Sequence, residues 1–228
     1  MHIEPGVVDG TRIALSYGTA AAAFGGAAKL AIDFVREKSI GDLAAKSLLA
    51  AVSVFVFFEI FFHYPVGVSE VHLILGTSLL MVFGTAPAAV GLVVGLLVQG
   101  VFFAPIDLPQ YGMNVTTLLV PLFATHFFAA RIIEKDRAYV DLRYSQVLRL
   151  SAVYQGGIVA WVAFWAFYGR GFTPDNLGAV ARFGGAYLSV IVIEPIVDLC
   201  LLAGAKALKK TAAVRGLRLL LNPRLYLS

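Results

Sequence analysis

Long apolar segments recur along the sequence, and each approaches the roughly 20 residues that a helix needs to cross a bilayer core of about 30 Å. These segments cover residues 12–34, 43–62, 71–84, 87–105, 115–131, 147–168 and 180–208. Because 59% of the 228 residues are hydrophobic and only 14% are charged, a water-soluble domain is excluded. We therefore expect an all-α fold, a polytopic integral membrane bundle of about seven transmembrane helices in a single domain, residues 1–228.

The positions of the basic residues predict the orientation of the bundle. The segment 71–84 is short for a span, so an alternative interpretation has six spans, with residues 71–105 as a kinked hairpin or a re-entrant element. With seven spans and an outer N-terminus, 15 of the 18 Lys and Arg residues fall on the cytoplasmic side, as the positive-inside rule requires. We therefore expect an outer segment 1–11, a transmembrane bundle 12–208 and a basic cytoplasmic tail 209–228.

Several classes of function are excluded by what the sequence lacks. No Gly-rich phosphate loop of the Walker type is present, so ATP hydrolysis would have to come from another chain. Cys200 is the single cysteine, which excludes an internal disulfide framework or a cysteine zinc cluster. The net charge of +4 is explained by topology, and we expect a lipid bilayer and no nucleic acid as the surroundings of this chain.

The first expected span differs from a secretory signal peptide and from a lipid-facing helix. Residues 1–10 contain no Lys or Arg, unlike a basic leader, so we expect Met1 to be retained. The stretch 20–28 is dense in Ala and Gly, which lets another helix approach closely. That helix would belong either to this chain or to a partner.

Three of the four histidines gather on the outer face in this topology. His2 lies in the outer N-terminal segment, His63 at the outer end of the second span and His72 at the outer start of the third, whereas His126 lies within the fifth. Histidine is the commonest transition-metal ligand, and the outer face offers few other charged groups. The sequence therefore predicts an outer metal site.

A histidine at position 2 has a particular chelating geometry. A free N-terminal amine, the deprotonated amide nitrogen of residue 2 and Nδ1 of its imidazole fill three corners of a square around one ion. A second imidazole is the natural fourth donor. Square-planar nitrogen ligands suit Ni(II), Cu(II) and low-spin Co(II) better than Zn(II) or Mg(II).

These residues resemble a known family, the substrate-binding membrane permeases of energy-coupling-factor (ECF) transporters for cobalt and nickel, of the CbiM/NikM type. The start Met1-His2-Ile3 is similar to the family's N-terminus, and Val71-His72-Leu73, preceded by Gly67 and Ser69, is similar to its Val-His-Leu motif. The stretch 112–115 is similar to its Gly-x-Asn element. The resemblance covers nearly the whole chain.

The resemblance implies a metal site formed by Met1, His2 and His72, which would hold Co(II) or Ni(II) as the transported substrate, with no organic cofactor. It also implies import across a prokaryotic plasma (inner) membrane by the substrate-binding component of an ABC transporter. The implied partners are a transmembrane coupling subunit, ATP-binding subunits and, in some systems, a small auxiliary membrane protein. The chain itself would not be an enzyme.

Further polar residues are candidates for supporting this site. Glu59 lies four residues before His63 in the second expected span, and we expect it to orient an imidazole. Ser69, Asn114 and Gln99 are neutral hydrogen-bonding candidates. His63 is interpreted as an aromatic-belt residue, with a gate or a first capture site as the alternative. In the last span, Glu194 and Asp198 are expected to be structural, by pairing with the basic flank or by facing a partner.

Two other classes of function are alternatives. A membrane-embedded metalloenzyme would need a catalytic acid, base or nucleophile beside an open coordination position, and no His-Glu-x-x-His pattern is present. A non-transporting membrane scaffold explains the hydropathy, but it gives no reason for polar groups to cluster on the outer face.

Overall fold

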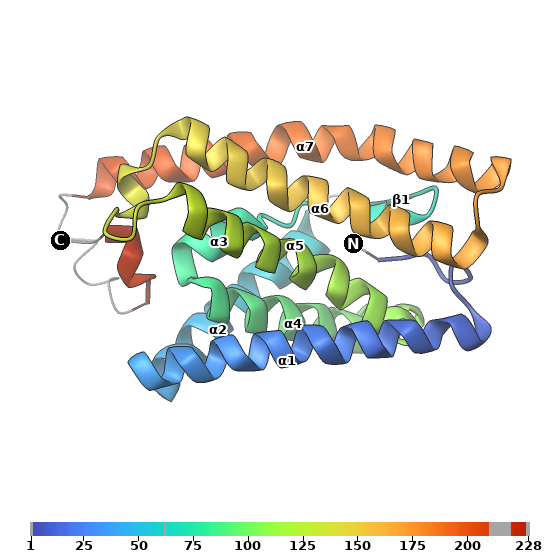
Figure 1. Cartoon of the computed structure of the whole chain (residues 1–228), viewed down its shortest axis with the longest axis horizontal. Helices are drawn as coiled ribbons and strands as arrows, with labels where there is room; N and C mark the ends of the chain where they lie inside the picture. Colours follow the sequence, from blue (N-terminus) through green and yellow to red (C-terminus); the bar gives the residue numbers. More distant parts are fainter. Residues whose placement is uncertain (1, 62, 210–219, 227–228) are drawn as a thin grey trace.

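The computed structural model describes residues 2–61, 63–209 and 220–226 as a bundle of helices with one small hairpin. In Figure 1, α6 and α7 lie along one edge of the bundle and α1 and α4 along the opposite edge, with α5 between them. The α-helices of the described residues are α1 (Ile13–Glu37), α2 (Ile40–Phe55), α3 (Gly76–Phe83), α4 (Thr85–Phe102), α5 (Tyr111–Ile132), α6 (Tyr144–Arg170) and α7 (Pro174–Leu208). The other elements are η1 (Gly10–Arg12), the π-helix η2 (Val56–Ile60), β1 (Tyr64–Val66), β2 (Ser69–Val71), η3 (Pro105–Gln110), η4 (Tyr139–Asp141) and η5 (Pro223–Tyr226).

Five helical segments of the described chain are long and apolar enough to cross a membrane, and they confirm the predicted all-α membrane fold. They are Ile40–Ile60, Thr85–Phe102, Pro105–Ile132, Tyr144–Arg170 and Pro174–Leu208. Helix α1 is 25 residues long but is rich in Ala and Gly, which are less hydrophobic than Leu or Ile. Its buried face consists of small residues that pack against α4 and α5: Ser16, Ala20, Ala23 and Ala27. At least one small-residue face of α1 therefore packs within this chain.

The third expected span differs most from the prediction of a helix over 71–84. Helix α3 has only 8 residues, about 12 Å of helix, and residues 72–75 before it are not helical. The extended part and the helix together reach about 25 Å, close to the thickness of a bilayer core. A non-helical backbone is tolerated at membrane depth only where protein covers it, and here Ile74 and Leu75 are buried.

The hairpin positions the N-terminal segment. Strands β1 and β2 are antiparallel, and Gly67 in their turn has φ +67°, with the carbonyl oxygen of Ala179 only 2.1 Å from where a Cβ would lie. Residue 3 forms a bridge with Ser69, and the Glu4 N–H donates to the Val68 carbonyl at 3.1 Å. The N-terminal segment therefore lies beside β2, held by this isolated bridge and the Glu4 hydrogen bond.

The described part of the expected cytoplasmic tail folds back onto the bundle. Arg224 donates to the carbonyls of Glu134 and Arg137, and its guanidinium lies 5.0 Å from the centre of the Tyr139 ring. The rest of the expected tail, residues 210–219 and 227–228, lies outside the described residues.

Candidate metal centre

Backbone hydrogen bonds hold His2 beside β2. The His2 carbonyl accepts hydrogen bonds from the Glu70 N–H at 2.9 Å and from the Ser69 hydroxyl at 2.8 Å. The next amide, that of Ile3, donates to Asn114 Oδ1 at 2.7 Å. Ser69 and Asn114 therefore fix the peptide group that follows the expected chelate, and neither forms a hydrogen bond to the imidazole. The amide nitrogen of His2 makes no hydrogen bond to a described residue, so it is free to act as a ligand.

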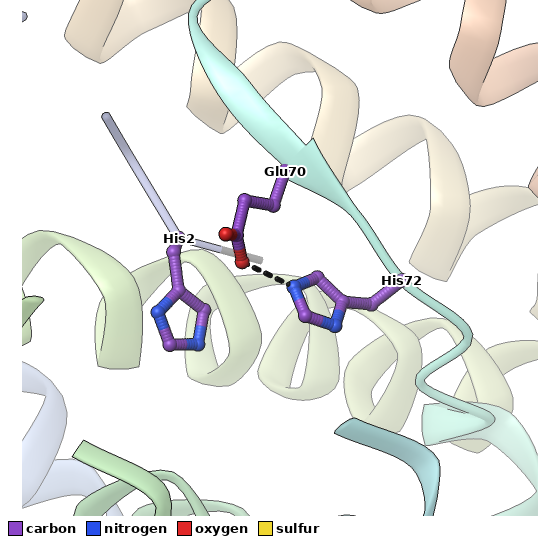
Figure 2. Close-up of side chains that lie close together, drawn as sticks. All are labelled: His2, Glu70 and His72. Carbon is purple, nitrogen blue, oxygen red and sulfur yellow. Dashed lines mark hydrogen bonds and ion pairs between the residues drawn. The ribbon is translucent and has the colours of Figure 1, made fainter. Parts of the chain in front are cut away.

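His2 and His72 meet although 70 positions separate them in the sequence. Their rings are stacked with centroids 5.4 Å apart, and the exposed fractions of the two residues are 2% and 1%. One donor atom from each of His2, Glu70 and His72 lies within 4.8 Å of the others. Figure 2 shows that the three side chains lie close together. Three groups that bind transition metals thus converge on one buried point.

The two nitrogens of His72 have different surroundings. Nε2 donates to Glu70 Oε2 at 2.8 Å, and Nδ1 is buried without a hydrogen-bond partner among the described residues. A carboxylate on one ring nitrogen commonly fixes the tautomer that leaves the other nitrogen free for a metal. A metal-binding imidazole must be neutral, and a ring with one hydrogen-bonded and one unpartnered nitrogen fits that form.

Both ring nitrogens of His2 face polar groups from the loop and helix beyond it. Nδ1 donates to Asp107 Oδ2 at 2.5 Å, and Nε2 lies 2.8 Å from Gln99 Oε1. Asp107 belongs to η3 and Gln99 to α4. A metal bound through Nδ1 would replace the Asp107 contact and leave this carboxylate beside the ion.

The charge around the two histidines is negative. Glu4, Glu70 and Asp107 all approach the site, and the pKa of Glu4 is raised, first by burial and then by repulsion from Glu70 and Asp107. Oε1 of Glu4 is buried without a partner among the described residues. A divalent cation would relieve this repulsion.

His63 lies beside the two histidines of the candidate site, although the sequence favoured a role in the aromatic belt. Its ring stacks on that of His72 with centroids 5.1 Å apart, on the other side of a row that runs His2, His72, His63. Phe58 packs against His72 at 5.2 Å. Nδ1 of His63 is also buried without a partner among the described residues, so this ring is a third available imidazole.

Other sequence predictions are placed differently by the structure. Glu59 makes no hydrogen bond to a histidine within the described chain, because the helix ends at Ile60 and the four-residue spacing to His63 is not helical. Glu194 and Asp198 are fully buried and point into the bundle, not toward the basic flank. Met1, an expected ligand, lies outside the described residues.

Sequence reasoning missed Glu70 and Asp107 as site residues. Glu70 had a usable signal, since residues two apart in an extended segment project to the same side, and Glu70 and His72 are two apart. Asp107 had none, because only the packing of η3 against the N-terminal segment brings it to His2.

The chain is similar to known proteins in its sequence pattern and in its fold. A family model described as "Cobalt uptake substrate-specific transmembrane region" (CbiM) matches residues 2–211. A solved structure of a transition metal transporter has a TM-score of 0.66 and 17% identity, covering 96% of this chain and 98% of that chain. A truncated transition metal transporter has a TM-score of 0.63 and 19% identity, covering 88% and 96%. No curated protein matches the chain in sequence.

Proposed function

Because the chain belongs to the CbiM family of cobalt-uptake transmembrane proteins, we propose that it is the substrate-binding subunit of an ECF-type transporter that captures Co(II) or Ni(II) at the outer face for import. The observation that carries this proposal is the buried pair of His2 and His72, with Nδ1 of His72 unpartnered among the described residues.

Family membership and several apolar spans make the chain a multi-pass protein of a prokaryotic membrane. The chain is a transport protein and not an enzyme. The metalloenzyme and the non-transporting scaffold are therefore set aside.

In the proposed bound state, the N-terminal amine, the His2 amide nitrogen and the His2 imidazole chelate one ion, and Nδ1 of His72 completes the set. Glu4, Glu70 and Asp107 attract the cation before it loses its water. The buried surroundings then favour an ion bound directly by nitrogen over a hydrated one. Four nitrogen donors in a plane suit Ni(II) and low-spin Co(II).

The proposed partners are a transmembrane coupling subunit and ATP-binding subunits, with a small auxiliary membrane protein in some assemblies. ATP hydrolysis on separate chains agrees with the absence of a Walker loop from this sequence. We assign the inner loop 132–146 and the basic tail to the contact with the coupling subunit, because they carry most of the expected cytoplasmic surface.

The proposal is tested by inserting two glycines between Met1 and His2 and measuring Co and Ni bound per purified chain. The insertion moves the imidazole to the fourth position, out of the fused chelate rings, so bound metal should be lost. The matched control inserts two glycines after Gly10, which lengthens the same outer segment but leaves the first dipeptide intact. If both variants bind metal as the parent chain does, the amino-terminal site is refuted.

A further inference from the structure

Helix α7 carries two carboxylates that the proposed outer site does not use. Glu194 and Asp198 are both 0% exposed and lie one helical turn apart in a segment apolar enough to span the membrane. No Lys, Arg or His among the described residues forms an ion pair with either of them. Buried acids at membrane depth are costly unless neutralised, and they commonly mark ion or proton pathways.

Neutral groups surround the two acids. Glu194 accepts hydrogen bonds from the Ile74 N–H and from the side-chain amide of Gln155, and Asp198 accepts one from the Ser78 hydroxyl. The Tyr187 hydroxyl donates to Gln155 Oε1 at 2.6 Å. We call the set Glu194, Asp198, Ser78, Gln155 and Tyr154 the buried acid cluster.

Tyr154 contributes a hydroxyl that nothing in the described chain satisfies. Its residue is 0% exposed, its oxygen has no hydrogen-bond partner there, and both Glu194 and Asp198 act on it electrostatically. The end of its ring lies against Gly76, where a Cβ would come within 2.0 Å of Cζ. A buried unsatisfied hydroxyl destabilises the fold, and this oxygen is available to a ligand that enters the cluster.

The cluster lies at the break in the third crossing segment. Leu75 has φ +54°, and α3 begins at Gly76, so the chain changes here from extended to helical. Interrupted helices in transporters commonly line ion sites near the middle of the membrane. Glu194 accepts its hydrogen bond from Ile74, before the break, and Asp198 accepts one from Ser78 in α3, after the break.

Two cavities lie on either side of the cluster along α7. The outer cavity, of ≈ 340 Å³, is lined by His72, Leu73, Val190 and Ile193 among others. The inner cavity, of ≈ 310 Å³, is lined by Ser78, Met81, Leu201 and Leu202 among others. Along α7, Glu194 and Asp198 fall between the residues that line the outer cavity and those that line the inner cavity, and Ser78 of the cluster lines the inner cavity itself.

We propose that the buried acid cluster is a second cation site, which a divalent metal ion occupies in transit between the outer histidine site and the cytoplasmic face. One divalent ion neutralises two carboxylates. Oxygen ligands hold Co(II) or Ni(II) more weakly than imidazoles do, and a transit site must release its ion. This inference rests on the proposed function, because it requires that the chain transports a metal.

Tyr154→Phe gives the sharpest test, because it removes only the unpartnered oxygen. If the cluster is merely structural, the variant should be as stable as the parent or more stable, and uptake should be unchanged. If the hydroxyl binds the ion, the initial rate of radioactive cobalt uptake, normalised to the amount of chain in the membrane, should fall at least 5-fold. The affinity of the outer site should stay within 2-fold of the parent. Uptake within 2-fold of the parent would overturn the proposal.

A second test measures the ion directly in the purified full chain with Co(II) as the probe. His72→Ala should leave one weaker Co(II) ion per chain, and adding Glu194→Gln and Asp198→Asn should weaken that binding by at least 10-fold. Adding Asp175→Asn instead, an exposed carboxylate of the same helix, should leave it unchanged. No residual ion in His72→Ala, or equal residual binding in all three variants, would reject the cluster as a cation site. Both results are independent of the glycine insertion, which tests the outer site alone.

Discussion

Glu70 and His72 form a carboxylate–imidazole pair at 2.8 Å that leaves Nδ1 of the histidine buried and unpartnered among the described residues. The carboxylate accepts the proton on Nε2 and so determines which nitrogen is the metal donor. The pair comes from β2 and the residue that follows it, so one short segment supplies both the ligand and the group that orients it (Figure 2).

Removal of this carboxylate should weaken metal binding while leaving the ligands in place. We expect Glu70→Ala to lower the affinity for Co(II) or Ni(II) by about 10–100-fold, the usual effect of losing a partner of a metal-bound histidine. Glu70→Gln should lose less, since its amide oxygen can still accept from Nε2. Competition with a chromogenic chelator measures both affinities. Glu59→Gln is the matched control and should bind as the parent does, because Glu59 contacts no histidine of the described chain.

The turn of the hairpin should be intolerant of any side chain. Gly67→Ala would place Cβ within 2.1 Å of the Ala179 carbonyl oxygen, so we expect a loss of at least about 2 kcal/mol in folding free energy and weaker metal binding. Gly171→Ala is the comparison, because φ there is +69° and no atom lies within 4 Å of the added Cβ. It should cost only the backbone strain, about 1–3 kcal/mol, and so less than Gly67→Ala, which adds a clash to the same kind of strain. Thermal unfolding in detergent compares the stability of the two variants. Equal losses of stability would show that backbone strain, and not the clash with Ala179, causes the effect at Gly67.

The membrane class, the helical bundle and the approach of His2 to His72 follow from particular features of the sequence. Apolar length identifies the spans, and the outer placement of His2, His63 and His72 predicts that they meet. The shortness of the run 71–84 indicates a kinked or re-entrant element over 71–105 as an alternative, but the position of the break before α3 could not be predicted, because it depends on tertiary contacts such as the hydrogen bond from the Ile74 N–H to Glu194. The contact between Asp107 and His2 could not be predicted either, since it depends on how η3 packs against the N-terminal segment.

The magnetic state of bound Ni(II) should identify the ligand set. The amide nitrogen of His2 is free of hydrogen bonds within the described chain, and Ser69, Glu70 and Asn114 hold the peptide group that follows His2. We therefore expect this nitrogen to bind, which gives a square-planar and diamagnetic Ni(II) ion. If Glu70 entered the coordination sphere with the two imidazoles instead, mixed nitrogen and oxygen ligands would favour a higher coordination number and a paramagnetic ion. Magnetic susceptibility of the nickel-loaded chain separates the two cases. Glu70→Gln should leave the ion diamagnetic, because in the expected state the carboxylate orients His72 without touching the metal.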